Sequence, residues 1–186
     1  MKLQSIYSLI FLAAACFVSC DSDDEPTDIR DQAVGTYTST VTTLIYDNGE
    51  THTPYEKEAA GELTISKSGD KELISDDGMR FVNIVEASNG FAFNVPTYVF
   101  QGKTISGYPD FAIGSVKYHG SYISAEKKFS VSFKIPLEDF ANDFAANLSD
   151  EDQLAILGIL GVEDWEELDT LSENVYFIFK FECVKK

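Results

Sequence analysis

Hydrophobic and polar residues alternate in short runs from residue 34 to residue 135, and this pattern predicts antiparallel β-structure. The clearest run covers 129–135, where apolar residues alternate with Ser and Lys before Pro136, which cannot donate a hydrogen bond to a neighbouring strand. A strand rich in Thr and β-branched residues is expected over 35–46. Further strands are expected at 62–66, around Leu73, at 81–85 and at 91–95, with turns at 47–49, 68–70, 76–78 and 88–90.

One irregularity in the alternation lies between residues 111 and 118. Phe111 and Ile113 share one strand face, whereas Val116 and Tyr118 have the opposite parity. A β-bulge across Gly114-Ser115 would produce this switch, and bulges bend strands where a sheet curves. With roughly eight or nine strands in all, the pattern favours a small closed antiparallel barrel, because closure removes exposed strand edges.

The spacing of apolar residues changes to a helical period between residues 137 and 172. Leu137, Phe140 and Phe144 are spaced for one face of a first helix. Ser149 is the expected N-cap of a second helix, and Gly161 its expected end. The apolar side of this second helix is expected to comprise Leu154, Ile156, Leu157, Ile159 and Leu160, and a short third segment to hold Trp165 and Leu168.

Strand character returns over 175–184, which is the expected last strand of the barrel. Its alternation places Phe177, Phe179, Phe181 and Cys183 inward, and Lys180 and Glu182 outward. Because the apolar faces of 129–135 and 175–184 have similar length, we expect these strands to be antiparallel neighbours, with the helical insertion covering one mouth of the barrel. An eight-stranded barrel has little interior space, so the phenylalanines are expected to fill it. The alternative is an open mouth lined by Tyr98, Tyr108 or Tyr122, which would favour a ligand.

Residues 1–20 have the organisation of an export signal. Lys2 is the only charge, the apolar run from Ile6 to Val18 is too short to span a bilayer, and Ser19 directly precedes Cys20. This ending resembles the lipobox of bacterial lipoproteins. The resemblance implies a lipoprotein signal peptide over 1–19 and a mature chain that begins at lipidated Cys20, while a plain secretory signal is the alternative.

The segment after Cys20 is acidic and contains no apolar residue over 21–25, which predicts a solvated tether over 20–32. It resembles the short acidic export tag of surface-exposed lipoproteins of the Bacteroidetes. The resemblance implies a protein anchored to the outer membrane by its N-terminal lipid and exposed at the cell surface.

A single domain is expected over 33–186. Its opening, Val34-Gly35-Thr36-Tyr37-Thr38, and the later Gly61-Glu62-Leu63-Thr64-Ile65 resemble the calycin-like (lipocalin-like) lipoproteins of gut Bacteroidetes. The resemblance implies a β-barrel that binds a small apolar ligand or a surface partner. The helical insertion near 137–172 departs from the plain barrel of that family.

The charge and the cysteine content of the chain disfavour some classes of partner and of stabilising bond. Removal of the signal leaves all 31 acidic and 13 of the 14 basic side chains, and so a formal charge of −18. Such a surface repels phosphate, so a nucleic-acid partner is disfavoured. Because Cys16 leaves with the signal and Cys20 is acylated, Cys183 remains alone, and we expect it to be a buried, unpaired core residue.

No residue pattern predicts a catalytic site, a metal site or a cofactor. His52, in the loop-like 51–54 segment, and His119, before Gly120, are expected to be exposed turn residues. The acidic stretch 138–173 lacks the spacing of a calcium loop, and its charges are expected to be solvated. Asp76-Asp77-Gly78 is expected to be a simple turn.

The ligand-binding candidates are four tyrosines, because a phenol combines an apolar ring with a polar tip. They are Tyr98, Tyr108, Tyr118 and Tyr122, and packing in the core or at its rim is the alternative for each. Asp169-Thr170-Leu171 also resembles the three-residue O-glycosylation signal of exported Bacteroidetes proteins, which would modify Thr170.

These observations favour a non-catalytic cell-surface lipoprotein that binds a small apolar or glycan ligand, or a surface partner. The alternative is a hydrolase that acts on glycans or lipids with acidic residues as catalysts. A third possibility is a structural subunit or inhibitor that uses an exposed strand edge. The three differ in what they require: an apolar pocket, two carboxylates in a cleft, or an uncovered edge.

Overall fold

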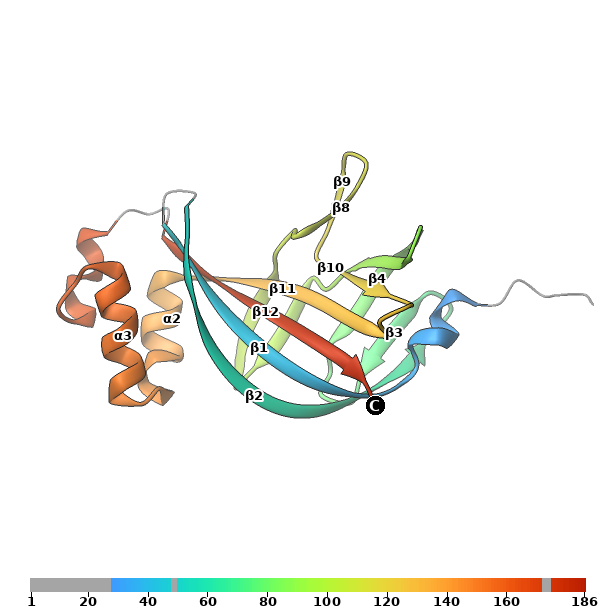
Figure 1. Cartoon of the computed structure of the whole chain (residues 1–186), viewed down its shortest axis with the longest axis horizontal. Coiled ribbons are helices and arrows are strands. Elements are labelled where there is room, and N and C mark those ends of the chain that lie inside the picture. Colours follow the sequence, from blue (N-terminus) through green and yellow to red (C-terminus); the bar gives the residue numbers. More distant parts are fainter. Residues whose placement is uncertain (1–27, 48–49, 172–174) are drawn as a thin grey trace, which may run out of the picture.

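The protein folds as a closed antiparallel β-barrel with a helical cap (Figure 1). The computed structural model describes residues 28–47, 50–171 and 175–186, without the side chains of 47, 50–60 and 168–170. Within these residues, eight strands close the barrel in the order β1-β2-β3-β4-β5-β10-β11-β12, and β12 pairs with β1. The predicted mainly β fold with a helical insertion before the last strand is confirmed.

The barrel strands vary widely in length, and the longest form one side of the molecule. Their bounds are Gly35–Asp47 (β1), Glu50–Ser68 (β2), Glu72–Ser75 (β3), Arg80–Ala87 (β4), Gly90–Asn94 (β5), Gly120–Ile123 (β10), Lys128–Pro136 (β11) and Tyr176–Lys185 (β12). The predicted antiparallel pairing of β11 with β12 is confirmed along nine residue pairs, from Lys128 opposite Val184 to Pro136 opposite Tyr176. His52, expected in a loop, lies in β2, and its side chain is outside the described part of the chain.

The other edge of β11 changes partner along its length. It pairs with β10 as far as Val131, and Phe133 and Lys134 then pair with β7 (Lys103–Gly107), which forms a hairpin with β6 (Thr97–Phe100). The chain between β7 and β10 leaves the barrel wall at this change of partner. The sequence pattern did not predict the β6–β7 hairpin.

The segment that leaves the wall forms a projecting hairpin, and the predicted bulge is wrong. Strands β8 (Phe111–Ile113) and β9 (Val116–Tyr118) pair with each other, with Ile113 opposite Val116 (Figure 1). Gly114 takes a φ of +60°, which glycine adopts without strain, and residues 114–115 are the two-residue turn. Such a turn changes the parity of apolar positions just as a bulge would, so the pattern alone could not separate the two.

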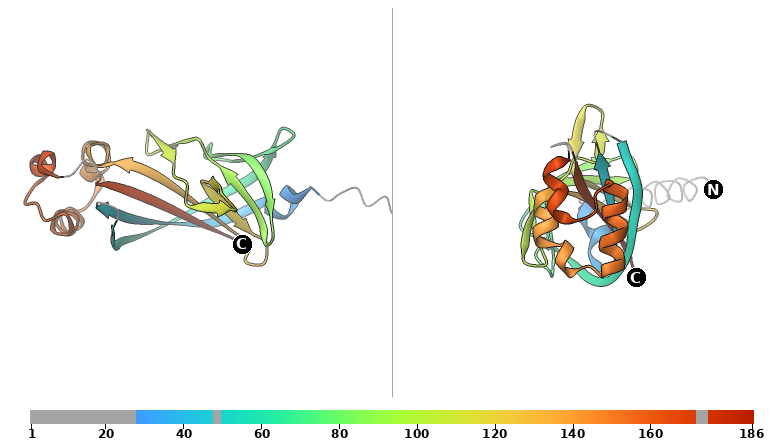
Figure 2. Two further views of the ribbon diagram at one scale, coloured as in Figure 1. Left: turned by 90° about the horizontal axis from the view of Figure 1, so that it is seen from above. Right: turned by 90° about the vertical axis from the view of Figure 1, so that its left-hand side faces the viewer.

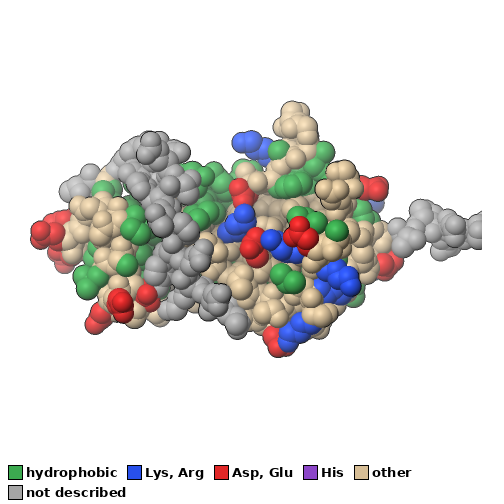
Figure 3. All heavy atoms as spheres, in the orientation of Figure 1, with side chains coloured by type: hydrophobic (Ala, Val, Ile, Leu, Met, Phe, Trp, Pro, Cys, Tyr) green, Lys and Arg blue, Asp and Glu red, His purple; other side chains and the backbone are tan. Residues whose placement is uncertain are grey.

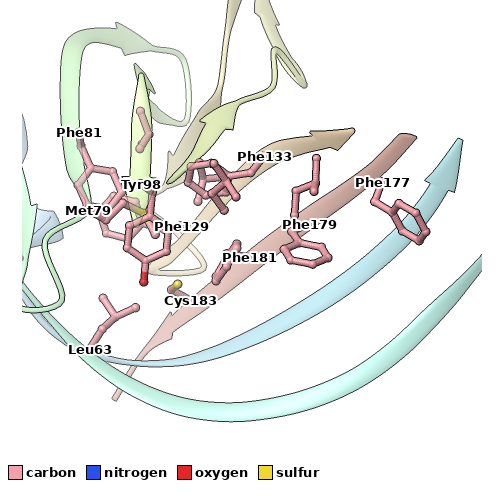
Figure 4. Packing of buried hydrophobic residues seen from close by; sticks show 14 of the residues in the cluster. Leu63, Met79, Phe81, Tyr98, Phe129, Phe133, Phe177, Phe179, Phe181 and Cys183 are labelled. Atoms are coloured by element: carbon pink, nitrogen blue, oxygen red, sulfur yellow. The ribbon is translucent and has the colours of Figure 1, made fainter. Parts of the chain in front are cut away.

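Aromatic side chains fill the barrel interior, as expected (Figure 4). Phe129 lies at the centre of one ring cluster, with its centroid 5.2 Å from those of Tyr37 and Phe81. Phe133 packs against Tyr98 and Phe181 at 5.6 and 5.5 Å. The inward residues predicted on β11 and β12 are all buried: Phe129, Val131, Phe133, Ile135, Phe177, Phe179, Phe181 and Cys183.

The helical cap comprises α2 (Leu137–Asp143), η2 (Ala145–Asn147), α3 (Asp150–Leu160) and η3 (Trp165–Thr170). It stands in front of one end of the barrel in Figure 2, right. Phe140 of α2 stacks on Phe177 of β12 with centroids 3.7 Å apart, which fixes the cap to the wall. Ser149 and Gly161 cap α3 as predicted: the Ser149 hydroxyl accepts from the Asp152 amide, and Gly161 is left-handed.

One prediction for α3 is wrong. Ile156 and Leu157 face the core as expected, but Leu154 is 66% exposed. With its neighbours apolar all round the helix, the apolar positions alone could not indicate which side turns inward.

The opposite end of the barrel is closed by the short helix η1 (Ile29–Ala33), which overlaps the end of the predicted tether. The Tyr122 hydroxyl donates to the Gln32 carbonyl at 2.7 Å, and Arg30 donates to the carbonyls of Gly69 and Glu72. The hydrogen bonds from Arg30 hold the pKa of the Asp28 carboxyl well below its usual range. Among the described residues, no helix is long and apolar enough to cross a membrane.

Candidate functional site

The site that we consider functional lies on the outer wall of the barrel, beside the projecting hairpin. Because Phe129, Val131 and Phe133 face inward, the residues between them on β11 face outward. Together with β10, β12 and the chain that leads into β8, they line a hollow of about 250 Å³. We call this hollow the wall groove, and its polar lining is Asp110, His119, Ser121, Lys128, Ser130, Ser132, Lys180 and Glu182.

Strand register determines which side chains meet in the groove. Ser130 lies opposite Ser121 of β10 on one side and Glu182 of β12 on the other. Directly opposed side chains in a sheet have Cβ atoms about 5 Å apart, so these three form one polar row. Lys128 lies next to this row and pairs with Glu182 at 2.9 Å.

A second polar row crosses the point where β11 changes partner. Ser132 is 1% exposed, and its hydroxyl donates to Asp110 at 2.9 Å. Lys180, opposite Ser132 on β12, approaches the same carboxylate at 3.9 Å. The Ser132 backbone binds both ends of the segment that leaves the wall, since its carbonyl accepts from the Tyr108 amide and its amide donates to the His119 carbonyl.

His119 is not the exposed turn residue that its position before Gly120 suggested. It joins β9 to β10 and is half-buried, and its Nδ1 lies 2.9 Å from the Val95 carbonyl oxygen and 3.2 Å from the Val95 amide nitrogen. A side chain at Gly107 would overlap this imidazole and the Val95 carbonyl, which explains the glycine there. The contact with Val95 attaches the base of the hairpin to the barrel.

A stack of tyrosines continues the site along the wall, and we call it the tyrosine stack. Tyr176, at the start of β12, stacks on Tyr46 of β1 with ring centroids 5.1 Å apart. The Tyr108 ring is 6.1 Å from that of Tyr176, and their hydroxyl oxygens are 3.5 Å apart. Lys134 lies over the Tyr176 ring at 3.9 Å, and partial burial, with the Tyr108 hydrogen bond, raises the pKa of Tyr176 to about 12.

The tyrosine stack and the wall groove are parts of one strip. Tyr108 connects them, because its backbone is bound to Ser132 and its ring meets Tyr176. All three tyrosines are half-buried, so part of each ring reaches solvent. The face drawn in Figure 3 carries basic and acidic side chains side by side, with hydrophobic side chains near the projecting hairpin.

Only one of the four tyrosines predicted as ligand contacts lies in this strip. Tyr98 and Tyr122 are in the packed interior, and the Tyr98 hydroxyl donates to Asp77 at 2.6 Å. Tyr118 is buried at the base of the hairpin, opposite Phe111. Tyr108 remains, and its partners Tyr46 and Tyr176 were not singled out from the sequence, because they come from segments 130 residues apart that meet only through the β1–β12 register.

Few polar side chains are buried in the described part of the chain. They are those of Thr43, Ser75, Ser121 and Ser132, and no carboxylate is included. No group of three His, Cys, Asp or Glu residues in the described part of the chain could hold a metal ion. Cys183 is a free, buried thiol, as predicted, while Cys20 and the side chain of Thr170 lie outside the described residues.

A larger hollow of about 800 Å³ lies beside η1 at the other end of the barrel. Its lining includes three carboxylates, those of Asp28, Glu86 and Glu126, and no aromatic ring. It therefore lacks the combination of ring faces and mixed hydrogen-bonding groups found in the wall strip.

The chain matches no protein-family model, no curated protein and no solved structure.

Proposed function

We propose that the protein is a non-catalytic, lipid-anchored surface protein that binds a glycan on the outer wall of its barrel. The anchor is the lipid on Cys20, supported by the lipobox and by the acidic tether that follows it. The binding surface is the strip formed by the tyrosine stack and the wall groove.

The observation that carries the proposal is the continuity of the tyrosine stack with the wall groove. Aromatic rings present flat apolar faces that suit the C–H faces of sugar rings. The adjoining groove offers hydroxyl, carboxylate and ammonium groups, which can donate to or accept from sugar hydroxyls. The opposite charges of Lys128 and Glu182, and of Lys180 and Asp110, offset one another, so the groove suits an uncharged, hydroxyl-rich ligand.

The packed interior argues against the apolar ligand of a typical lipocalin-like barrel. Phe81, Phe91, Phe93 and Phe129 are at most 2% exposed and are in ring contact within one cluster. Phe133 is fully buried against the rings of Tyr98 and Phe181. A ligand that entered the barrel would have to displace them.

The hydrolase alternative gains no support from the groove. Glycoside hydrolysis needs one carboxylic acid and one carboxylate that face each other across a substrate cleft. Asp110 and Glu182 each have a lysine partner instead, and Ser132 donates to Asp110 and has no imidazole as a base. The His119 Nδ1 atom is occupied by Val95.

A glycan array probed with the purified mature chain tests the proposal. Ser130→Trp should fill the groove and abolish the signal, because Ser130 lies in the middle of its polar row. Ser66→Trp is the matched control, since Ser66 is exposed on β2 and does not line the groove. The proposal would be contradicted if the Ser130→Trp variant bound the same glycan as well as the wild type does. It would also be contradicted if the wild-type protein bound no glycan on the array.

A further inference from the structure

A second surface with an unexplained composition lies on the helical cap, at the far end of the barrel from η1 (Figure 1). The exposed side of α3 consists of Glu151, Leu154, Ala155 and Gly158, which we call the outer face of α3. These residues are spaced three and four apart and therefore share one side of the helix. The intramolecular contacts of α3 are made by its other side, through Ile156 and Leu157.

The packing of the described residues does not account for the apolar part of the outer face. Leu154 is the most exposed large hydrophobic residue among the described residues, at 66%. Gly158 is the C-terminal member of this face and lies inside the helix, where glycine lowers helix stability relative to alanine. A side chain at Gly158 would meet no atom within 4 Å, so the fold does not require a glycine there. Leu154 and Gly158 together form an apolar surface over which the helix backbone can be approached closely.

The charge around this face indicates what kind of partner it fits. The chain has no Lys or Arg between Lys134 and Lys180, while α2, α3 and η3 carry many carboxylates. Two of them begin α3, Glu151 on the outer face itself and Asp150 next to it, and neither has a cationic partner among the described residues. Acidic side chains with hydrophobic side chains between them are visible at this end of the molecule in Figure 3.

We propose that the outer face of α3 docks a basic amphipathic helix of a partner protein. The apolar side of such a helix would cover Leu154 and pass close to Gly158, and its Lys or Arg side chains would meet the surrounding carboxylates. A second copy of this chain fits less well, because its own α3 would bring like charges together. The surface is distinct from the glycan strip, and its position opposite η1 faces it away from the tethered end of the domain.

The single tryptophan of the chain makes this proposal measurable. Trp165 is half-buried in η3, and its indole donates to Gln153 of α3 at 3.1 Å, so its fluorescence reports on the helix. The probe is a peptide of leucine and lysine in helical periodicity, and a leucine–glutamate peptide of the same pattern is its control. We expect saturable binding of the lysine peptide to the full mature protein and no binding of the glutamate peptide.

Two variants separate docking from simple attraction between opposite charges. Leu154→Glu makes the surface more acidic but removes the apolar contact, so we expect binding to weaken about 10-fold or more, as for the loss of one buried leucine side chain. The control Val99→Glu also replaces an exposed apolar side chain with glutamate, at a residue of β6 that is 58% exposed, and should leave affinity unchanged. Gly158→Ala should raise the melting temperature of the protein and weaken its binding of the peptide. If Gly158 had only a structural role, the substitution would not weaken binding.

Several outcomes would overturn the proposal. Unchanged or tighter binding by Leu154→Glu would show that charge alone attracts the peptide. A wild-type dimer in analytical ultracentrifugation that Leu154→Glu dissociates would identify a second copy as the occupant. A wild-type protein that binds neither peptide would exclude a basic helix.

Discussion

The inner and outer faces of β11 and β12 differ in chemistry although both faces belong to the same two strands. Inward, Phe133 and Phe181 are in ring contact 5.5 Å apart and are almost wholly buried. Outward, Ser130 and Lys180 line a hollow with a hydrogen-bonded carboxylate at its edge. Packing constrains the first set, whereas little in the fold demands the second, so the outward residues are where function is expected.

Phe133→Ala should be the most damaging change on the inner face. The ring is fully buried against Tyr98 and Phe181, so its removal leaves a cavity and should lower the free energy of unfolding by about 3–5 kcal/mol. Urea denaturation followed by circular dichroism measures this change. A loss well under 1 kcal/mol would mean that the ring borders solvent-filled space, and an interior ligand would then become the better hypothesis.

Cys183→Ser tests the inner face with a change of almost no volume. The serine hydroxyl would be buried beside aromatic rings, which should cost about 1–3 kcal/mol of unfolding free energy. Cys183→Ala is the control, because it also removes the sulfur but adds no polar group. It should lower the free energy of unfolding less than Cys183→Ser does under the same conditions.

The same cysteine gives a prediction for pH dependence. Burial, and to a lesser extent the Asp77 carboxylate, raise the pKa of the Cys183 thiol from 9.0 to about 12. The neutral thiol is the form that the fold favours, so its contribution to stability is complete below pH 9.0 and is lost as the pH rises towards 12. Thiol reagents should label the native protein slowly even at pH 9.0, and rapid labelling would contradict the burial.

Ser132→Ala should have a smaller effect, because it lies on the outer face. The substitution removes the hydrogen bond to Asp110, whose carboxylate stays accessible to water, so the expected loss is about 1 kcal/mol. Glycan binding should fall in the same variant, since Asp110 loses the group that orients it. A stability loss with unchanged binding would make the Ser132–Asp110 pair a structural attachment of the hairpin only.

Much of the barrel could be predicted from the sequence because its strongest signals are local. The period-two pattern of 129–135 needs only neighbouring residues to show an inner and an outer face, and the caps Ser149 and Gly161 are equally local. The antiparallel neighbours β11 and β12 could be inferred because their apolar faces have matching lengths. Each of these signals can be recognised within one or two segments, without knowledge of how the rest of the chain is arranged.

Apart from Tyr108, the candidate site could not be predicted, because it depends on register between distant segments. Tyr46 and Tyr176 stack because β1 pairs with β12 in one particular register, and no pattern in either strand specifies that offset. The projecting hairpin and the exposure of Leu154 were predicted wrongly for another reason, which is that the local pattern fits two structures. Parity cannot separate a turn from a bulge, and apolar residues all round a helix cannot indicate which side is covered.

Native mass spectrometry of the protein extracted from its own membranes tests most directly the claim that the interior is packed and the outer wall is the binding surface. We expect the mass of the lipidated mature chain, with no apolar molecule retained by the folded protein. An added glycan identified on the array should appear as a bound species for the wild type and Ser66→Trp, but not for Ser130→Trp. A co-purified apolar molecule that is released only on unfolding would contradict the account.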